Sequence, residues 1–491
     1  MASLVLALVG CSDAAGPTTF VVAGVHTVSP EASPFADCTA DLDPGMDWHA
    51  GRVHPWIAVD PNDPQRIAAV YAQDVYDVGE QPQDNRGLVV ASSLDGGVTW
   101  EATVVPGITR CADGAWDQVR HAWMTAGSNG DLYVLAQPAM GWVRWAEGAP
   151  TAAHVVARST DWGRTWGTPV EVVRVPESEP GYPSYGVLSA HPTEACTLYA
   201  TFTRYVGVGW FGSLELARST DCGATWETPQ VVSGVRRQSR FPHAAQVRVL
   251  ADGTLVSLHT AGDTLVAQRS VDGGVTWSSP PVQFGTDVRE WIPMPGPSDF
   301  AGRVDSGPME VAHDPATDRL YAVWAERLEA DRGLGVAFVE STDGGLTWST
   351  PVLIDGVPAH DDMRMGQALM PAVAVASNGT VGVLYLSFER DVVEDAATHM
   401  DAWLTTCRPG DVCTQASAWS ARPLRLTPAS FDMRHAAYVE ACADGAAPAE
   451  CHWYYIAFHL GLEGWGDGFA AVLPVPDDAG DRIQVITVEP E

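Results

Sequence analysis

The chain has 491 residues and carries 28 Lys and Arg against 61 Asp and Glu, which gives a formal net charge of −33. Such an acidic chain disfavours nucleic acids and anionic membrane surfaces as partners, because they carry charge of the same sign. The length would allow two or three ordinary domains, but no Ser/Pro-rich linker or block of charge divides the chain. This continuity indicates one repetitive domain, and we expect a monomer.

An apolar run over residues 4–9 is followed by Gly and Cys, so that the segment ends in Leu-Val-Gly-Cys at Cys11. It resembles the lipobox of bacterial lipoproteins, which implies a signal segment over residues 1–11 and a lipid on Cys11. No Lys or Arg precedes the run, although secretory signals normally begin with one. No later segment is long and apolar enough to span a bilayer, so a lipid anchor is the only membrane contact we expect.

The pattern Ser-x-Asp-x-Gly-x-Thr-Trp occurs five times, each time between two apolar, β-prone runs. This setting predicts the turn of a β-hairpin. Asp and Ser bond to backbone groups in tight turns, Gly adopts a positive φ, and Trp packs between sheets. The pattern therefore predicts a structural role for its aspartates, which are Asp95, Asp161, Asp221, Asp272 and Asp343.

This octapeptide resembles the Asp box of sialidases and related bacterial-neuraminidase-repeat proteins. The resemblance implies an all-β fold, a β-propeller of four-stranded blades with Asp-box turns, over residues 51–491. We expect seven blades, with six as the alternative. The units lie near 54–105, 120–175, 185–232, 242–284, 308–354, 370–427 and 435–475.

The last unit lacks an obvious outer strand. Either residues 20–22 in the N-terminal segment 12–50 or residues 483–486 near the C-terminus could supply it. A terminal strand in this position would close the ring and remove an exposed sheet edge.

Without Cys11 the chain has eight cysteines, an even number that fits an oxidising compartment and therefore a protein exported to the cell envelope or surface. In the propeller register that the resemblance implies, one pair links two turns on the same face of the third blade. Two more pairs bracket turns in the last two units. The expected disulfides are Cys196 with Cys222, Cys407 with Cys413 and Cys442 with Cys451. Cys38 and Cys111 are the two cysteines that are left, and they form the fourth expected pair.

In a propeller, the loops that join second to third strands share one face with the connections between blades, and the Asp boxes lie on the other. We therefore expect function on the first face. Its long loops carry aromatic residues beside carboxylates, among them Trp142 and Trp210, and such pairs suit the faces and hydroxyls of sugar rings. The alternative is that these rings pack against their own blades.

Five arginines stand where first, innermost strands are expected to begin, which would place them at the mouth of the central channel. They could bind ligand carboxylates, because a guanidinium makes bidentate bonds to them, or neighbouring aspartates could neutralise them in structural pairs. The five are Arg52, Arg120, Arg240, Arg364 and Arg434.

Sialidases hold a substrate carboxylate with three arginines and use an Asp acid and a Tyr nucleophile assisted by a Glu. The resemblance implies that Arg52 is the first arginine, although Arg52-Val53-His54-Pro55 has one residue more than the family's Arg-Ile-Pro. Arg240 with Arg364 or Arg434 could complete the triad. No Tyr stands out by its motif. The candidate catalytic carboxylates are Asp74 or Asp77 as the acid and Glu310 or Glu389 beside a Tyr.

Three histidines, His121, His243 and His435, follow arginines or aromatic residues at the expected channel mouth, but no local metal-ligand motif accompanies them. We therefore predict no metal and no cofactor. The sequence favours an exported, sialidase-like propeller that recognises an acidic glycan and, if it is catalytic, hydrolyses it as an exo-sialidase does. The alternative is a non-catalytic propeller that binds a polysaccharide or a protein partner at the cell surface.

Overall fold

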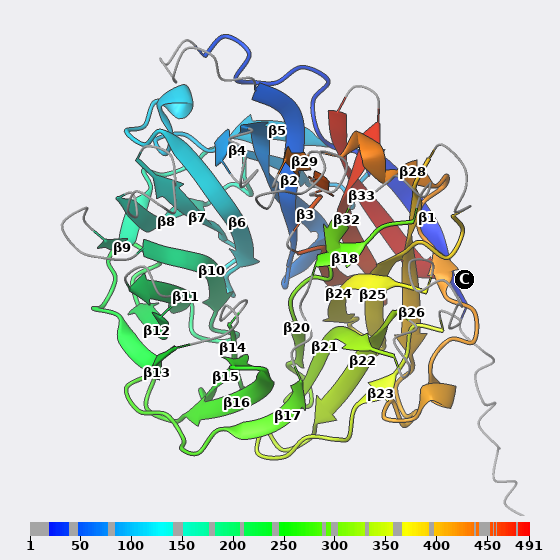
Figure 1. The fold of residues 1–491 in the computed structure, drawn as a ribbon. Helices are drawn as coiled ribbons and strands as arrows, with labels where there is room; N and C mark the ends of the chain where they lie inside the picture. Colours follow the sequence, from blue (N-terminus) through cyan, green and yellow to red (C-terminus); the bar gives the residue numbers. More distant parts are fainter. Residues whose placement is uncertain are drawn as a thin grey trace, which may run out of the picture.

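In the computed structural model, most of the described residues form β-strands (Figure 1). In the described residues no helix is long and apolar enough to cross a membrane. The described residues are 19–38, 48–76, 84–140, 151–175, 182–206, 211–237, 245–286, 291–295, 303–328, 333–356, 366–391, 397–436, 438–440, 452–454, 456–457, 459–477 and 480–491.

The strands form antiparallel four-stranded units that follow one another along the chain. The first three are β2 (Trp48–Asp60), β3 (Asp63–Tyr76), β4 (Asp84–Ser93) and β5 (Glu101–Val104); β6 (Gln118–Ala126), β7 (Leu132–Ala139), β8 (Ala152–Ser159) and β9 (Val170–Val175); and β10 (Tyr182–Ala190), β11 (Leu198–Val206), β12 (Phe211–Ser219) and β13 (Gln230–Arg237). A single residue pair, Asn85 with Val119, joins the first unit to the second.

Three further units follow the same order. They are β14 (Gln246–Val249), β15 (Leu255–Ala261), β16 (Thr264–Ser270) and β17 (Val282–Thr286); β20 (Glu310–Asp314), β21 (Arg319–Arg327), β22 (Leu334–Ser341) and β23 (Val352–Leu353); and β24 (Ala368–Val375), β25 (Val381–Ser387), β26 (His399–Cys407) and β27 (Leu424–Arg425), with β28 (Phe431–Asp432) also paired to β26. The described 3-10 helices are η1 (Arg110–Ala112), η4 (Ala416–Ala418) and η5 (Met433–His435).

The last unit combines both ends of the chain. It contains β31 (Gly461–Trp465), β32 (Gly468–Asp477), β33 (Gly480–Pro490) and, on its outer edge, β1 (Phe20–Thr27). β1 pairs antiparallel with β33 from Phe20 opposite Pro490 to Thr27 opposite Gln484. The two segments that we regarded as alternatives for the outer strand are therefore both used, one as the third strand and one as the fourth.

The last unit begins later in the chain than predicted. Its first strand starts at Gly461, whereas we expected the unit to start near residue 435. The intervening chain contributes β29 (Tyr438–Glu440) and β30 (His452–Tyr454), which join β18 (Trp291–Pro293) and β19 (Arg303–Asp305) in a separate small sheet. The prediction failed because these short strands belong to no repeat.

The first strands of successive units lie side by side around the middle of the molecule (Figure 1). β2 contacts β6, β6 contacts β10, β10 contacts β14, β14 contacts β20, β20 contacts β24, β24 contacts β31, and β31 contacts β2. Apolar residues of neighbouring units, such as Val70, Val134 and Ala200, pack together in the buried layers between the sheets. This arrangement directs seven first strands toward one central region.

Each octapeptide forms the turn between the third and fourth strands of its unit, and the hydrogen bonds repeat five times. In the third unit, Ser219 Oγ accepts from the Gly223 amide at 3.0 Å and donates to Asp221, whose carboxylate accepts from the amide and hydroxyl of Thr225. The glycine has a φ of 79°, a conformation that Gly adopts without strain. The hydrogen bonds from Thr225 lower the pKa of Asp221.

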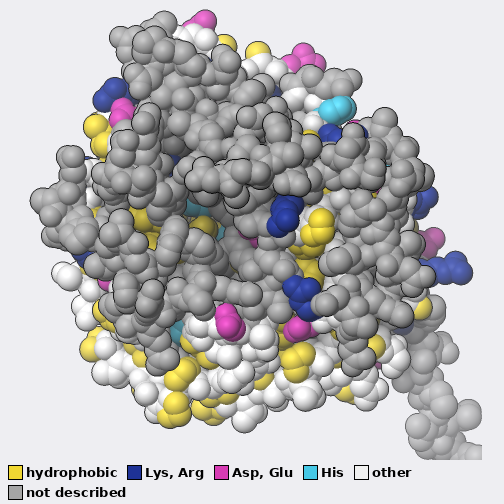
Figure 2. All heavy atoms as spheres, viewed as in Figure 1, with side chains coloured by type: hydrophobic (Ala, Val, Ile, Leu, Met, Phe, Trp, Pro, Cys, Tyr) yellow, Lys and Arg dark blue, Asp and Glu magenta, His cyan; other side chains and the backbone are white. Residues whose placement is uncertain are grey.

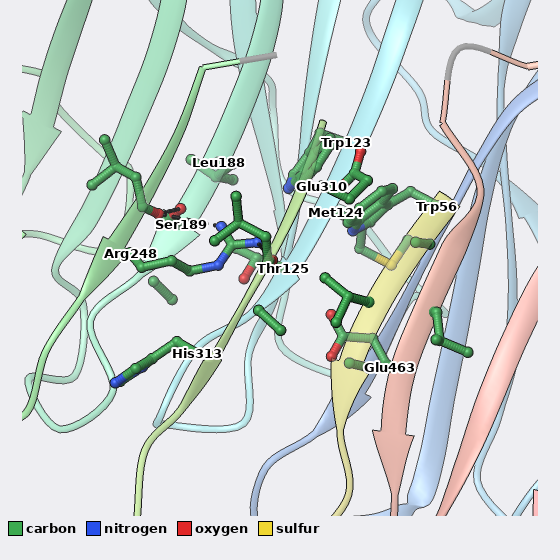
Figure 3. A pocket seen from close by; sticks show the side chains of 18 of the residues that line it. Trp56, Trp123, Met124, Thr125, Leu188, Ser189, Arg248, Glu310, His313 and Glu463 are labelled. Carbon is green, nitrogen blue, oxygen red and sulfur yellow. Dashed lines mark hydrogen bonds between the residues drawn. The ribbon is translucent and has the colours of Figure 1, made fainter. Parts of the chain in front are cut away.

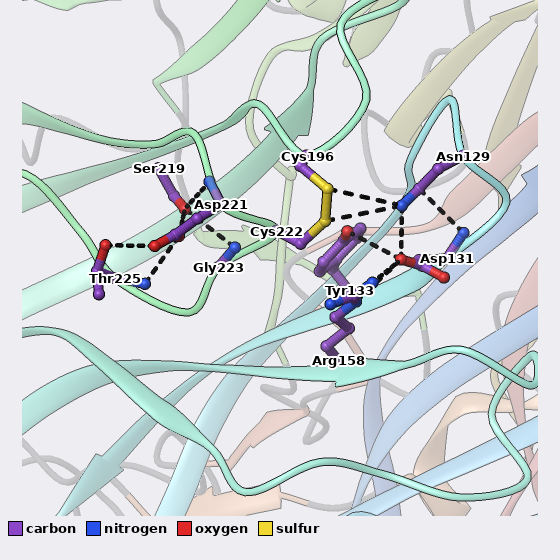
Figure 4. Close-up of a disulfide and its surroundings, with 10 residues drawn as sticks. All are labelled: Asn129, Asp131, Tyr133, Arg158, Cys196, Ser219, Asp221, Cys222, Gly223 and Thr225. Atoms are coloured by element: carbon purple, nitrogen blue, oxygen red, sulfur yellow. Dashed lines mark hydrogen bonds and ion pairs between the residues drawn. A yellow bond between two sulfur atoms is a disulfide. The ribbon is translucent and has the colours of Figure 1, made fainter.

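The described residues contain the disulfides Cys38–Cys111, Cys196–Cys222 and Cys407–Cys413, which confirms these three predicted pairings. Cys196–Cys222 joins the turn between β10 and β11 to the box of the same unit, and Asn129 of the preceding unit lies against it (Figure 4). Turns between first and second strands therefore share one side of the molecule with the boxes. The predicted lipidation site and the predicted fourth disulfide, Cys11 and Cys442 with Cys451, lie outside the described residues.

Candidate functional site

Three of the first strands have a shift in their pairing register at equivalent positions. The pairing register shifts between Val53 and Trp56 in β2, between Arg120 and Trp123 in β6, and between Ser184 and Val187 in β10. Within each irregularity one residue is left-handed: His54 with φ 56°, His121 with φ 42° and Tyr185 with φ 51°. Such bulges redirect a side chain, and unfavourable backbone conformations concentrate at functional sites.

The three redirected side chains form an arc across neighbouring units. The ring centroids of His54 and His121 are 5.0 Å apart, and those of His121 and Tyr185 are 4.8 Å apart. Arg120, beside His121 in β6, is 3% exposed and donates from Nε to Gln118 at 3.2 Å. One guanidinium thus stands beside two imidazoles at the start of the first strands, and we call these four residues, Arg120, His54, His121 and Tyr185, the mouth cluster.

The imidazoles of the mouth cluster are neutral. Burial lowers the pKa of His54 to about 3, and the electrostatic effects of His459 and Arg120 lower it further. Burial also holds the pKa of His121 well below its usual range, with His54 and Arg120 adding to the effect. A group whose charged form is disfavoured by burial and by like charges stays uncharged at neutral pH, so Arg120 supplies the positive charge of the mouth cluster.

A second aromatic layer lies beneath the mouth cluster. Trp56 and Trp123 stack with centroids 3.6 Å apart, and His459 stands edge-on to Trp123 at 5.4 Å. His459 Nδ1 donates to Glu310 Oε1 at 2.5 Å, and Gln246 Nε2 donates to the other oxygen of Glu310 at 2.6 Å. Between the two layers there is a cavity of only about 10 Å³. The aromatic layer therefore separates the mouth from the space below it.

Below the aromatic layer is a cavity of about 220 Å³, lined by residues from all seven first strands (Figure 3). Arg248, Glu310 and Glu463 bring charge to it. Arg248 Nη2 donates to Gln246 Oε1 at 2.6 Å, which extends the hydrogen-bond chain from Glu310. Burial raises the pKa of Glu463 to about 7, with Arg248 lowering it and Glu310 raising it.

The predicted residues Arg52 and Asp74 are brought together through Gln73. Arg52 Nε donates to Gln73 Oε1 at 3.1 Å, and Gln73 Nε2 donates to Asp74 Oδ1 at 2.7 Å. The Arg52 guanidinium also donates to the backbone carbonyls of Pro30 and Asp481. Asp74 is buried and accepts from Ser33 Oγ. These bonds agree better with the structural interpretation of Arg52 than with the ligand-binding one.

The other predicted residues are dispersed. Arg434 lies in η5 and pairs with Asp432 at 3.4 Å, so its predicted place before a first strand is wrong; His459 precedes the first strand of the last unit instead. Glu389 is exposed in the turn after β25, whereas Glu310 lies at the top of the cavity. Outside the described residues lie Asp77, Trp142, Trp210, Arg240, His243 and Arg364.

Sequence reasoning placed His121 at the channel mouth but missed the other aromatic residues of both layers, although the chain carries a signal for them. His54-Pro55-Trp56 and His121-Ala122-Trp123 are His-x-Trp sequences at equivalent places in two first strands. Tyr185 occupies the same place in the third. When equivalent residues of successive units are compared, this pattern indicates two stacked aromatic layers around the centre of the molecule.

The mouth cluster has the chemistry of an anion site. Arg120 offers a fixed positive charge, and neutral imidazoles and a phenol both donate and accept hydrogen bonds to carboxylates and hydroxyls. Among the described residues no group of three His, Cys, Asp or Glu side chains is arranged to hold a metal ion.

No family model matches the chain, and no curated protein matches its sequence. Among solved structures, the Hadza microbial sialidase Hz136 is 18% identical with a TM-score of 0.43, over 69% of this chain and 64% of that one. A Trypanosoma rangeli sialidase is 12% identical with a TM-score of 0.43, over 91% and 60%. A Dyadobacter fermentans protein of unknown function is 17% identical with a TM-score of 0.46, over 74% and 99%. The chain thus spans less than two thirds of either sialidase, and likenesses at these TM-scores carry no argument about its activity.

Proposed function

We propose that this chain is an exported, seven-bladed β-propeller that binds an acidic glycan at the mouth of its central channel. Seven units whose first strands contact one another in series support seven blades over six. The pairing of β1 with β33 supports closure, because a terminal strand removes the exposed edge of the last sheet.

The mouth cluster is the observation that carries the choice of ligand. In a chain of net charge −33, the mouth cluster places a buried guanidinium beside two neutral imidazoles, and a guanidinium is the side chain best suited to pair with a carboxylate. Figure 2 shows Lys or Arg side chains near the middle of one face, with Asp or Glu side chains close to them. A negatively charged sugar fits this site, because the guanidinium pairs with its carboxylate and the rings pack against its carbon atoms.

Binding is better supported than hydrolysis. Asp74 accepts hydrogen bonds from Ser33 and Gln73, and Glu310 accepts from His459 and Gln246, so two of the three predicted carboxylates in the described residues already hold protein donors. The third, Glu389, is exposed in the turn after β25. A non-catalytic propeller that binds a polysaccharide or a protein is therefore the second candidate. Three disulfides support export, since disulfides persist in oxidising compartments, and a lipid on Cys11 remains a prediction.

A screen of matched glycans tests the proposal. The purified protein is assayed against pairs that differ by an acidic group, such as 3′-sialyllactose with lactose and oligogalacturonate with its methyl ester. We expect binding of acidic members alone, weakening as salt rises because ions screen the attraction. Chromatography of the same mixtures measures any free acidic sugar that is released. Equal binding of both members, or of neither, would contradict the proposal and favour the second candidate.

A further inference from the structure

The cavity beneath the aromatic layer is lined by a carboxylate from the first strand of the last unit. Glu463, in β31, reaches into the cavity, and no hydrogen bond or ion pair joins its carboxylate to the protein's described residues. Glu310 lies across the cavity from Glu463, and Arg248 is the arginine that lines the same cavity. Two carboxylates face one guanidinium, so the fully ionised cavity carries an excess negative charge.

The lining residues and the volume of the cavity limit which kind of ligand could balance that negative charge. Leu188, Val311 and Leu462 line part of it, although more of its exposed lining is polar than apolar, and its volume is about 220 Å³. A water molecule takes up about 30 Å³ in the liquid, so the cavity exceeds the size of a single ion. A carboxylate beside the side chains of Leu188, Val311 and Leu462 suits a molecule with a short hydrocarbon chain and a cationic N–H group.

The cavity and the mouth cluster face different sides of the molecule. The stacked Trp56 and Trp123 close it above. Its lining extends to Pro192 and His313, at the ends of the first strands beside the turns that lead to β11 and β21. Cys196–Cys222 shows that such turns lie on the side of the boxes. The cavity thus faces the side opposite the mouth cluster.

We propose that this cavity is a second binding site, which takes a small primary ammonium compound whose N–H groups pair with Glu463 and Glu310. Glu310 can take part because an ionised carboxylate has about four acceptor positions, and His459 and Gln246 use two. The charged and titratable groups around the site are Glu463, Glu310, Arg248, His313 and, through its bond to Glu310, His459.

Calorimetric titration with n-butylammonium chloride at pH 8, and with 1-butanol as the uncharged match, tests the site. We expect wild type to bind the ammonium ion and not the alcohol. Glu463→Gln should weaken binding roughly tenfold or more, the effect of losing a charge-assisted hydrogen bond, while substitution of the exposed Glu489 in β33, Glu489→Gln, should not change it. Glu463→Gln removes a buried charge, so its melting temperature should not fall.

Two further measurements separate this site from the mouth. Binding of n-butylammonium should weaken as the pH falls through about 7, because protonation of Glu463 removes its charge. Addition of 3′-sialyllactose should leave the affinity for the ammonium ion unchanged. The second site is refuted if wild type binds no n-butylammonium at millimolar concentrations, if Glu463→Gln binds it as wild type does, or if the glycan competes with it. None of these results depends on whether the mouth binds a glycan.

Discussion

Deletion of residues 20–27, the whole of β1, is expected to lower the free energy of unfolding by at least about 3 kcal/mol and to promote association of the protein. Phe20, Val22 and Val25 pack against the core of the last unit, and the ring of Phe20 lies 5.8 Å from that of Phe469. Burial of such a side chain contributes about 1.5–3 kcal/mol when it is complete, and these three are partly buried. The exposed edge of β33 would then be open to pairing with other chains.

Urea unfolding and size-exclusion chromatography measure the two effects. Val21→Asp is the matched control, because Val21 is 36% exposed on the outer side of the same strand, and its stability should stay within about 0.5 kcal/mol of wild type. A deletion variant that remains monomeric with an unchanged unfolding midpoint would show that β1 does not close the last unit.

Trp123→Ala is expected to lower the free energy of unfolding by about 3–5 kcal/mol, the usual loss for a buried Trp. Trp123 is 4% exposed and stacks on Trp56, so removal of its ring leaves a void that the two strands β2 and β6 cannot easily fill. The same void would connect the mouth cluster with the cavity below, so n-butylammonium binding should then respond to 3′-sialyllactose.

Trp100→Ala serves as the control for this change, because Trp100 belongs to a box and is only partly buried. Its loss should be clearly smaller in the same urea titration. A decrease below about 1 kcal/mol for Trp123→Ala would mean that the aromatic layer does not support the centre of the fold.

Much of the fold could be predicted because its signals are local. A box places a hairpin turn by bonds within eight residues, as Ser219, Asp221 and Thr225 show, and so it also fixes which strands are third and fourth. Once that register is known, Cys196 and Cys222 fall in neighbouring turns. The all-β class and three disulfides followed from these short-range patterns.

The candidate site was less predictable because bulges alter the direction of side chains. Side chains alternate along a regular strand, and one extra residue reverses the alternation beyond it. Sequence alone does not tell whether Arg52 or His54 faces the centre; the bulge directs His54 inward, and Arg52 bonds to carbonyls of neighbouring segments. His459 was missed for another reason, since the chain before it forms β29 and β30 outside any repeat.

The affinity of 3′-sialyllactose for wild type and for Arg120→Gln, measured by calorimetry, tests the central claim most directly. Arg319→Gln is the control, because the Arg319 side chain is 45% exposed, far from the mouth cluster in sequence, and its melting temperature and affinity should match wild type. Arg120→Lys should restore part of the affinity if the charge itself is what binds. We predict that Arg120→Gln weakens binding roughly 10- to 100-fold while it remains folded. A folded Arg120→Gln variant with wild-type affinity would contradict the account.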